Sequence, residues 1–161
     1  MEISVRKATA DDYNSLCELF SEVDALHRDH LPHLFQKPGG AAREQDYYSE
    51  LIADENAALL VAEAGEKLVG FVHAFVREPP AMPVFVPRRY VIADSIVVSS
   101  EFQNQGIGGT LMDKMQEWAI EKGATSIELN VYEFNQSAIS FYERLGYQSL
   151  SRKMSREIKK D

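Results

Sequence analysis

Residues Val91–Met112 read VIADSIVVSSEFQNQGIGGTLM, an apolar run followed by a polar turn and then by glycines. The apolar run holds a single acid, Asp94, and predicts a buried β-strand. The turn leads into Gly106-Ile107-Gly108-Gly109, and apolar residues at helical spacing follow at once. At such a helix start free N–H groups converge, the helix dipole adds positive charge, and glycines let the backbone approach an anion. The stretch therefore predicts a site for the diphosphate of a nucleotide-like cofactor.

Two common phosphate-binding motifs do not fit this turn. The dinucleotide fingerprint needs a third glycine where this chain has Leu111, and no Lys-Ser or Lys-Thr pair of a P-loop follows the glycines. Residues 103–108, QNQGIG, instead resemble the acetyl-coenzyme A signature Gln/Arg-x-x-Gly-x-Gly/Ala of the GNAT superfamily of acetyltransferases.

Two further stretches carry the same resemblance. Residues 96–102, IVVSSEF, are similar to the family's approach to the signature, with Ser100 where proline is common. Residues 135–147, NQSAISFYERLGY, are similar to the family pattern N-x-x-A-x-x-F-Y-x-x-x-G-F/Y. The motifs stand in the family's order and at its separation, and the resemblance extends from Arg6 to the end of the last expected strand.

The resemblance implies acetyl-coenzyme A as a co-substrate and no metal. Gln103 stands where arginine is more common and adds no charge, so the anion is left to the N–H groups of Gln105 through Thr110, with Lys114 as a candidate cation. Ile96 and Val98 would pair through their backbones with the pantetheine amides. The expected cofactor-binding residues are Ile96, Val97, Val98, Gln103, Asn104, Gln105, Gly106, Ile107, Gly108, Gly109, Thr110, Asn135 and Tyr142.

Acetyl transfer from a thioester to an amine requires a base for the amine and an acid for the departing thiolate. Tyr142 is the candidate acid, because a phenol and a thiol have pKa values within roughly 2 units. Asn135, seven residues earlier, is either a helix cap or a contact to the pantetheine. Asp94 is the candidate base or a structural acid; on strict alternation it shares a face with Ile92 and Ile96, and burial is expected to raise its pKa.

The histidines and the single cysteine are interpreted as residues outside the chemistry of the site. His27, His30 and His33 lack the carboxylate or cysteine partners of a usual zinc site. His73 lies among apolar strand residues and is interpreted as a core or pocket-lining residue rather than a base. Cys17 has core spacing and no activating base nearby, which disfavours an acetyl-cysteine intermediate.

The expected fold is an α/β (α+β) domain spanning 1–161, with a mixed, mostly antiparallel sheet flanked by helices. Hairpin signals at Gly65-Glu66 and strand–helix–strand units late in the chain predict that only the strands at 90–98 and 126–131 are parallel. The resemblance implies that this pair splays apart. The expected strands are 2–8, 57–64, 67–76, 90–98, 126–131 and 147–155. The first helix is expected to follow a capping-box-like start at Thr9–Asp12 and to end before Pro32, and further helices are expected over 45–53, 108–122 and 136–145.

Composition limits the function. The chain has 161 residues, a formal net charge of −8 and one cysteine. The acidic balance disfavours nucleic-acid binding, no run is long enough for a membrane span, and the N-terminus lacks a signal-peptide core. Cytoplasmic location is expected because the single cysteine fits a reducing compartment. The apolar stretch Val84-Phe85-Val86-Pro87 is either a loop surface for assembly or a homodimer edge.

The resemblance implies an acetyl-coenzyme A-dependent N-acetyltransferase that acts by direct attack in a ternary complex. Its acceptor is a small-molecule or peptide amine, and a small amine, a polyamine, an aminoglycoside or a peptide N-terminus all remain open. The alternative is a non-catalytic acyl-coenzyme A sensor or regulatory protein on the same fold.

Overall fold

The computed structural model describes residues 2–160, which fall into two compact units. The first unit ends at Asn130 and the second begins at Val131. No helix among the described residues is both long and apolar enough to cross a membrane.

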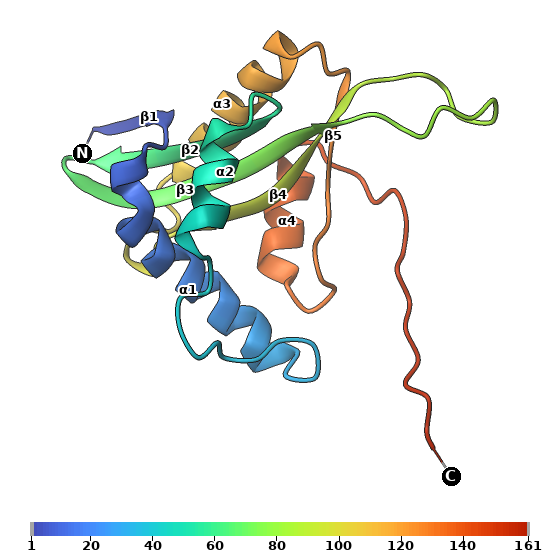
Figure 1. Cartoon of the computed structure of the whole chain (residues 1–161), viewed down its shortest axis with the longest axis horizontal. Coiled ribbons are helices and arrows are strands. Elements are labelled where there is room, and N and C mark those ends of the chain that lie inside the picture. Colours follow the sequence, from blue (N-terminus) through green and yellow to red (C-terminus); the bar gives the residue numbers. More distant parts are fainter. Residues whose placement is uncertain (1, 161) are drawn as a thin grey trace. The chain divides into compact units, whose positions relative to one another are not determined.

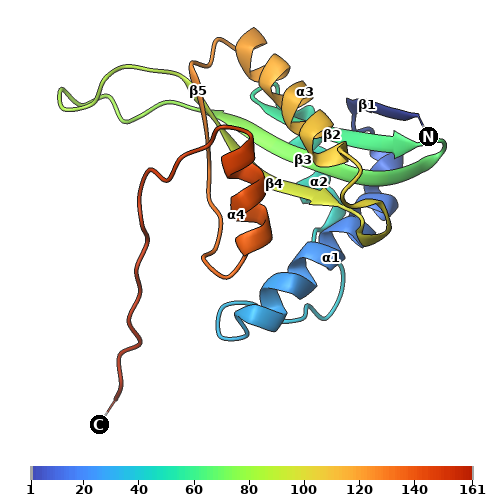
Figure 2. The ribbon, with the colours of Figure 1, turned by 180° about the vertical axis from the view of Figure 1, so that it is seen from behind.

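The first unit is a mixed five-stranded sheet with helices on both faces. Its sheet order is β1-β2-β3-β4-β5, and only the β4–β5 pair is parallel. Figure 1 shows α1 and α2 on one face of the sheet, and Figure 2 shows α3 on the other. The elements are β1 (Ile3–Lys7), α1 (Tyr13–His30), α2 (Gln45–Ala53), β2 (Ala57–Ala64), β3 (Lys67–Arg77), β4 (Tyr90–Val98), α3 (Ile107–Glu121) and β5 (Ser126–Leu129). The predicted fold class is confirmed.

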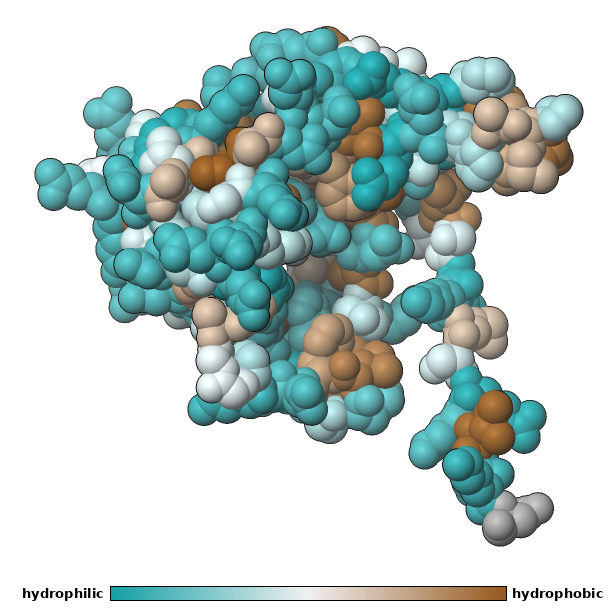
Figure 3. All heavy atoms as spheres, in the orientation of Figure 1, coloured by the Kyte–Doolittle hydropathy of each residue, from teal (hydrophilic) through white to brown (hydrophobic). Residues whose placement is uncertain are grey.

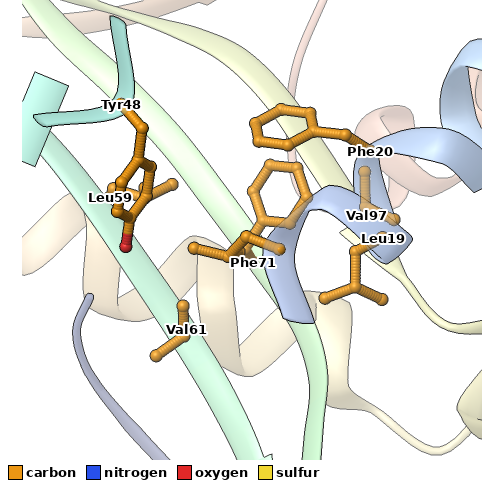
Figure 4. Packing of buried hydrophobic residues seen from close by; sticks show 8 residues of the cluster. Leu19, Phe20, Tyr48, Leu59, Val61, Phe71 and Val97 are labelled. Carbon is orange, nitrogen blue, oxygen red and sulfur yellow. The ribbon is translucent and has the colours of Figure 1, made fainter. Parts of the chain in front are cut away.

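The apolar face of α1 packs on the centre of the sheet. Phe20 of α1 lies against Phe71 of β3 with 4.5 Å between ring centroids, and Val97 of β4 joins the same cluster (Figure 4). Leu16 and Leu19 recur at helical spacing and are buried there. Burial of each such side chain stabilises the fold by roughly 1.5–3 kcal/mol. This core holds β3 and β4, which carry the candidate site, in a fixed register.

Close backbone packing joins α3 to the opposite face. A Cβ on Gly70 of β3 would lie 2.7 Å from the carbonyl oxygen of Val97 and 3.3 Å from Leu111 of α3. No side chain fits at this position without movement of the backbone. Gly70 thus lets the first turns of α3 lie directly on β3, next to the end of β4.

The loop between β3 and β4 is exposed and apolar at its tip. Figure 3 shows apolar side chains gathered there, at the end of the extended hairpin. The exposed large residues are Met82, Val84, Phe85 and Val86. The prolines around them remove backbone donors, so this segment forms turns rather than a ladder.

The second unit contains α4 (Gln136–Arg144), and no strand follows it among the described residues. The predicted strand over 147–155 is therefore wrong: the chain after Gly146 is irregular, and it is exposed from Gln148 onward. The reason lies in the spacing of its apolar residues. Leu150, Met154 and Ile158 are four residues apart, and Arg152 and Arg156 stand between them on the same side of an extended chain. This segment therefore has no continuous apolar face with the period of two that a sheet buries.

Candidate functional site

The glycine turn forms a cluster of free backbone donors. Asn104 and Gly106 have positive φ angles of 64° and 81°, and α3 begins directly after them at Ile107. No side chain caps this helix start. The first intrahelical bond runs from the Thr110 N–H to the Gly106 oxygen at 3.1 Å, so the N–H groups of residues 106–109 have no acceptor within the helix. Together with the helix dipole they can bind an anion.

Three residues near the turn, Thr110, Gln103 and Lys114, form contacts within the protein. Thr110 donates both its N–H and its hydroxyl to the Gly106 oxygen at 3.1 Å. Its N–H, which was expected to be available to a phosphate, is therefore already bonded within the helix. The Gln103 side chain donates to the carbonyl oxygen of Val98 at 3.0 Å and closes the end of β4. Lys114 forms an ion pair with Glu117 on its own helix, with 3.3 Å between nitrogen and oxygen. The donors without an acceptor at this turn are therefore the backbone N–H groups of residues 106–109.

The end of β4 offers further backbone groups. The Ser99 N–H donates to the Val69 oxygen at 2.8 Å, and antiparallel partners alternate between bonded and non-bonded pairs. Val98 with Gly70 and Ile96 with Val72 are therefore non-bonded pairs, so the N–H and C=O groups of Ile96 and Val98 point away from β3. On that side, β5 pairs with β4 only from Tyr90 to Ala93.

A β-bulge divides β4 at Asp94. His73 pairs with Ser95 and Ala74 pairs with Ala93, so Asp94 is an extra residue with no partner on β3. Directly paired residues share a face of the sheet. The predicted uninterrupted alternation along β4 is therefore wrong. The side chains before and after the bulge alternate between the two faces of the sheet, but the order of faces shifts by one residue at Asp94.

The bulge decides where Asp94 points. Its Oδ2 lies 3.4 Å from Nδ1 of His73, whose side chain is on the same face as Phe71 and therefore on the α1 side of the sheet. Ile96, two residues along, pairs with Val72 and lies on the opposite face. Sequence alternation had grouped Asp94 with Ile96, and the extra residue separates them.

The pKa of Asp94 moves opposite to the expectation. The hydrogen bond from His73 lowers the pKa of Asp94, and the positive charges of Arg43 and Arg77 act in the same direction. Desolvation raises it but does not prevail, since the Asp94 side chain remains 51% exposed. Asp94 is therefore ionised at neutral pH, a ready but weak proton acceptor.

The second unit contains the other two candidate residues. Asn135 caps α4: its Oδ1 accepts a hydrogen bond from the Ala138 N–H at 3.3 Å, as the capping interpretation predicted. Tyr142 packs edge-on against Tyr147 with 5.9 Å between ring centroids, and Phe141 packs against Tyr142. Burial raises the pKa of Tyr142 to about 12. Its phenol is protonated at neutral pH and can donate a hydrogen bond.

The histidines of α1 and the following loop do not form a metal site in the part of the chain that the structure describes. His27 stacks on Phe35 with 5.3 Å between ring centroids, and His30 Nδ1 lies 3.0 Å from the Leu26 oxygen. No group of three His, Cys, Asp or Glu side chains that could hold a metal occurs among residues 2–160.

Sequence reasoning missed the contact between His73 and Asp94. It placed His73 in the core, and the side chain is indeed 5% exposed, but the ring also reaches the acid. The signal was weak, because the contact depends on a bulge that no residue pattern in β4 announces. Arg43 and Arg77, which act on Asp94 from outside β4, were likewise not singled out.

A family model described as "Acetyltransferase (GNAT) family" matches residues 21–147. The chain belongs to this family. An uncharacterized N-acetyltransferase of Methanocaldococcus jannaschii is 28% identical over 145 residues, which cover 90% of this chain and 60% of that protein. This chain thus spans well under the full length of that relative.

Solved structures share the fold of the chain. A mutant of the Bacillus halodurans protein BH1408 has a TM-score of 0.90 at 22% identity, covering 96% of this chain and 99% of that one. The protein AAC(6')-Iy, solved with the bisubstrate analog CoA-S-monomethyl-acetylneamine, has a TM-score of 0.75 at 16% identity, covering 99% of both chains. At these identities the likeness concerns the fold.

Proposed function

We propose that this chain is an acetyl-coenzyme A-dependent N-acetyltransferase, which transfers acetyl to a primary amine by direct attack in a ternary complex. One observation carries the proposal. The open backbone groups at the end of β4 lead directly into the free N–H groups at the start of α3. A ligand with an amide-containing arm and a diphosphate matches that sequence of donors and acceptors. Membership of the acetyltransferase family supports the same ligand.

The coenzyme's two parts would use two kinds of protein group. Ile96 and Val98 would hydrogen-bond the amides of the pantetheine arm, as an added strand would. The Val98 oxygen already accepts from Gln103, so Ile96 and the Val98 N–H carry most of this pairing. The N–H groups of residues 106–109 would bind the diphosphate. The AAC(6')-Iy complex, which contains a coenzyme A analog, supports this class of ligand.

Asp94 would act on the amine. The thioester supplies an activated acetyl group, so the protein must deprotonate the amine and orient it. As the nitrogen forms its bond to the acetyl carbon, Asp94 would accept the amine proton, directly or through a water molecule. Because its pKa is lowered, Asp94 is ionised before the reaction at every pH near neutrality.

Tyr142 would act on the leaving group. As the bond between the acetyl carbon and sulfur breaks, charge develops on sulfur and the phenol would donate to it. With a pKa of about 12 the phenol is a weak acid, so a hydrogen bond to the thiolate is favoured over complete early transfer of the proton. Asn135 has its oxygen engaged in the helix cap, which leaves its NH₂ group for the pantetheine.

The family model crosses the boundary between the two compact units, since it spans residues 21–147. This supports the proposal that the units act together as one domain. The acceptor is a small-molecule or peptide amine. The acetylated aminoglycoside portion of the AAC(6')-Iy ligand belongs to that protein and supports only the general class, an amine.

The test is acetyl transfer by the purified chain across a panel of amines. Release of free thiol from acetyl-coenzyme A, together with a mass increase of one acetyl group on the amine, is the expected result. Binding of acetyl-coenzyme A without thiol release for any amine in the panel would favour the sensor. Absence of binding would contradict both functions.

A further inference from the structure

His73 is a polar side chain inside an apolar wall. It is 5% exposed, its ring lies 5.7 Å from the ring of Phe75, and Phe71 lies on the same face of β3. Burial of a polar group is costly unless it finds a hydrogen-bond partner. An apolar residue would fill this position without the desolvation cost of a polar group. Packing alone therefore does not explain the imidazole.

The two ring nitrogens of His73 differ in their surroundings. Nδ1 lies 3.4 Å from Asp94 Oδ2, whereas Nε2 is buried and has no hydrogen-bond partner among the described residues. A proton on Nδ1 can be donated to the carboxylate, whereas with the proton on Nε2 the Nδ1 lone pair would face the carboxylate and the N–H would be buried without a partner. The surroundings therefore favour the tautomer with its proton on Nδ1, which makes His73 a hydrogen-bond donor to Asp94.

The β-bulge and His73 form one arrangement. The extra residue turns Asp94 toward the α1 face, where Nδ1 of His73 lies 3.4 Å from one carboxylate oxygen. The opposite side of the Asp94 side chain remains half exposed. A carboxylate fixed at one oxygen has a defined orientation at the other.

We propose that His73 is a positioning residue of the acetyl transfer, whose Nδ1–H holds Oδ2 of Asp94 so that Oδ1 faces the amine. The proposal rests on the proposed function, in which Asp94 accepts the amine proton. As the nitrogen–carbon bond forms, the proton moves from nitrogen to Oδ1 and then to solvent through the exposed side of Asp94. In this arrangement His73 exchanges no proton with the substrate.

Other charges also act on Asp94. Arg43, from the segment before α2, and Arg77, at the end of β3, favour its ionised form together with His73. Arg43 is held by Asp24 with 3.0 Å between nitrogen and oxygen, and Arg77 lies over the Phe75 ring at 4.0 Å. Neither arginine depends on His73 for its place. Replacement of His73 therefore removes the hydrogen bond and leaves both positive charges.

Two amide variants separate positioning from packing. His73→Asn places an NH₂ donor near the position of Nδ1, and His73→Gln places it near that of Nε2. We expect His73→Asn to keep kcat within about 3-fold of the parent, and His73→Gln to lower kcat roughly 10-fold or more with the KM for acetyl-coenzyme A little changed. Equal kcat in the parent and in His73→Gln, or equal loss in both variants, would overturn the proposal.

A readout without turnover tests the contact alone. Carboxyl NMR of the folded protein should show a higher Asp94 pKa in His73→Gln than in the parent, because the donated hydrogen bond is lost. His73→Leu, which fills the core without a buried polar group, serves the same measurement if the glutamine variant does not fold. An unchanged Asp94 pKa would overturn the proposal even in an inactive protein. A raised pKa with a kcat insensitive to Asp94→Asn would instead refute the role of Asp94 in the proposed function.

Discussion

Gln103 and Val98 are joined across the end of β4 by a hydrogen bond of 3.0 Å from the side-chain amide to the backbone oxygen. The glutamine that resemblance had assigned to the phosphates thus fixes the strand from which the turn departs. In the proposed function the backbone N–H groups of the turn bind the diphosphate, and this side chain orders the strand end before them.

Gln103→Ala should weaken acetyl-coenzyme A binding moderately. Loss of this exposed hydrogen bond costs about 0.5–1.5 kcal/mol, which corresponds to an increase of about 2- to 12-fold in Kd if the turn becomes mobile. Isothermal titration measures the change. Gln116→Ala, which removes an exposed glutamine side chain from α3, is the control and should bind like the parent. A Gln103→Ala variant with parental affinity would show that the hydrogen bond does not order the site.

Acetyl-coenzyme A should raise the melting temperature of the parent. At a ligand concentration of one hundred times Kd, it should add about 2.7 kcal/mol to the free energy of unfolding. Gly108→Val should abolish this shift, because its side chain would stand among the free N–H groups at the helix start. Gly39→Val is the matched control, since a Cβ at Gly39 meets nothing within 4 Å. A parental shift in Gly108→Val would contradict the central inference about the turn.

Tyr142→Phe should lower kcat by roughly 10²-fold or more while coenzyme affinity stays nearly constant, because only the hydroxyl is lost. Rapid-quench kinetics of the acetyl-transfer step measure the effect directly. Tyr147→Phe removes a neighbouring hydroxyl of the same kind and should have a smaller effect. A parental rate in Tyr142→Phe would return Tyr142 to a packing role.

Asp94 should not produce the rise of kcat/KM with pH near neutrality. Its pKa is lowered from 3.8, so it is already ionised there, and the rise must follow deprotonation of the amine. With two acceptors of different basicity, the midpoint of the rise should move with the acceptor. Asp94→Asn should be slow at neutral pH and recover partly at high pH, where the amine arrives neutral. Parallel profiles of similar height in parent and variant would make Asp94 structural.

The ion-pair cluster at the start of α1 should govern acid stability. Hydrogen bonds from Arg6 hold the pKa of Asp12 below its usual value of 3.8, and Arg6 Nη1 lies 2.8 Å from Asp12 Oδ2. A lowered folded-state pKa stabilises the fold above the unfolded pKa, and this stabilisation is lost as pH falls through the folded one. The free energy of unfolding should therefore drop below pH about 4 in the parent.

Asp12→Asn should cost about 1–3 kcal/mol at neutral pH and should lose less further stability in acid than the parent. Asp11→Asn, at the exposed neighbouring carboxylate, is the control and should behave as the parent does. Urea unfolding at pH 7 and pH 3 gives both quantities. Identical acid sensitivity in Asp12→Asn and the parent would show that other carboxylates dominate.

The extent of agreement between sequence and structure follows from which interactions are local. Apolar spacing and the glycines placed β4, the turn and α3 within about a residue, since these patterns act over a few positions. The bulge at Asp94 depends on how β3 and β4 pair over long separation, and no local pattern specifies it. The bond from Gln103 to Val98 is equally invisible, because a glutamine has no fixed preference between a phosphate and a carbonyl.

The same limit explains the missing last strand. Tyr147 through Ser155 contains residues found in strands, and the family resemblance extended to it, but Leu150 and Met154 flank Arg152 on the alternating set that they would share. A strand also needs a neighbouring strand with free backbone groups, and the residues of the segment itself do not show whether such a neighbour exists.

Because of the extra residue in β4, we expect the fold to tolerate substitutions at position 94 and not a deletion there. A change of side chain at position 94 leaves both halves of the strand in their frames. Removal of the residue would bring both halves into one alternation, so that either Val91 and Ala93 or Val97 would move to the other covered face of the sheet, against a different helix. Libraries that vary position 94 should thus retain folded members, whereas a single-codon deletion there should yield none.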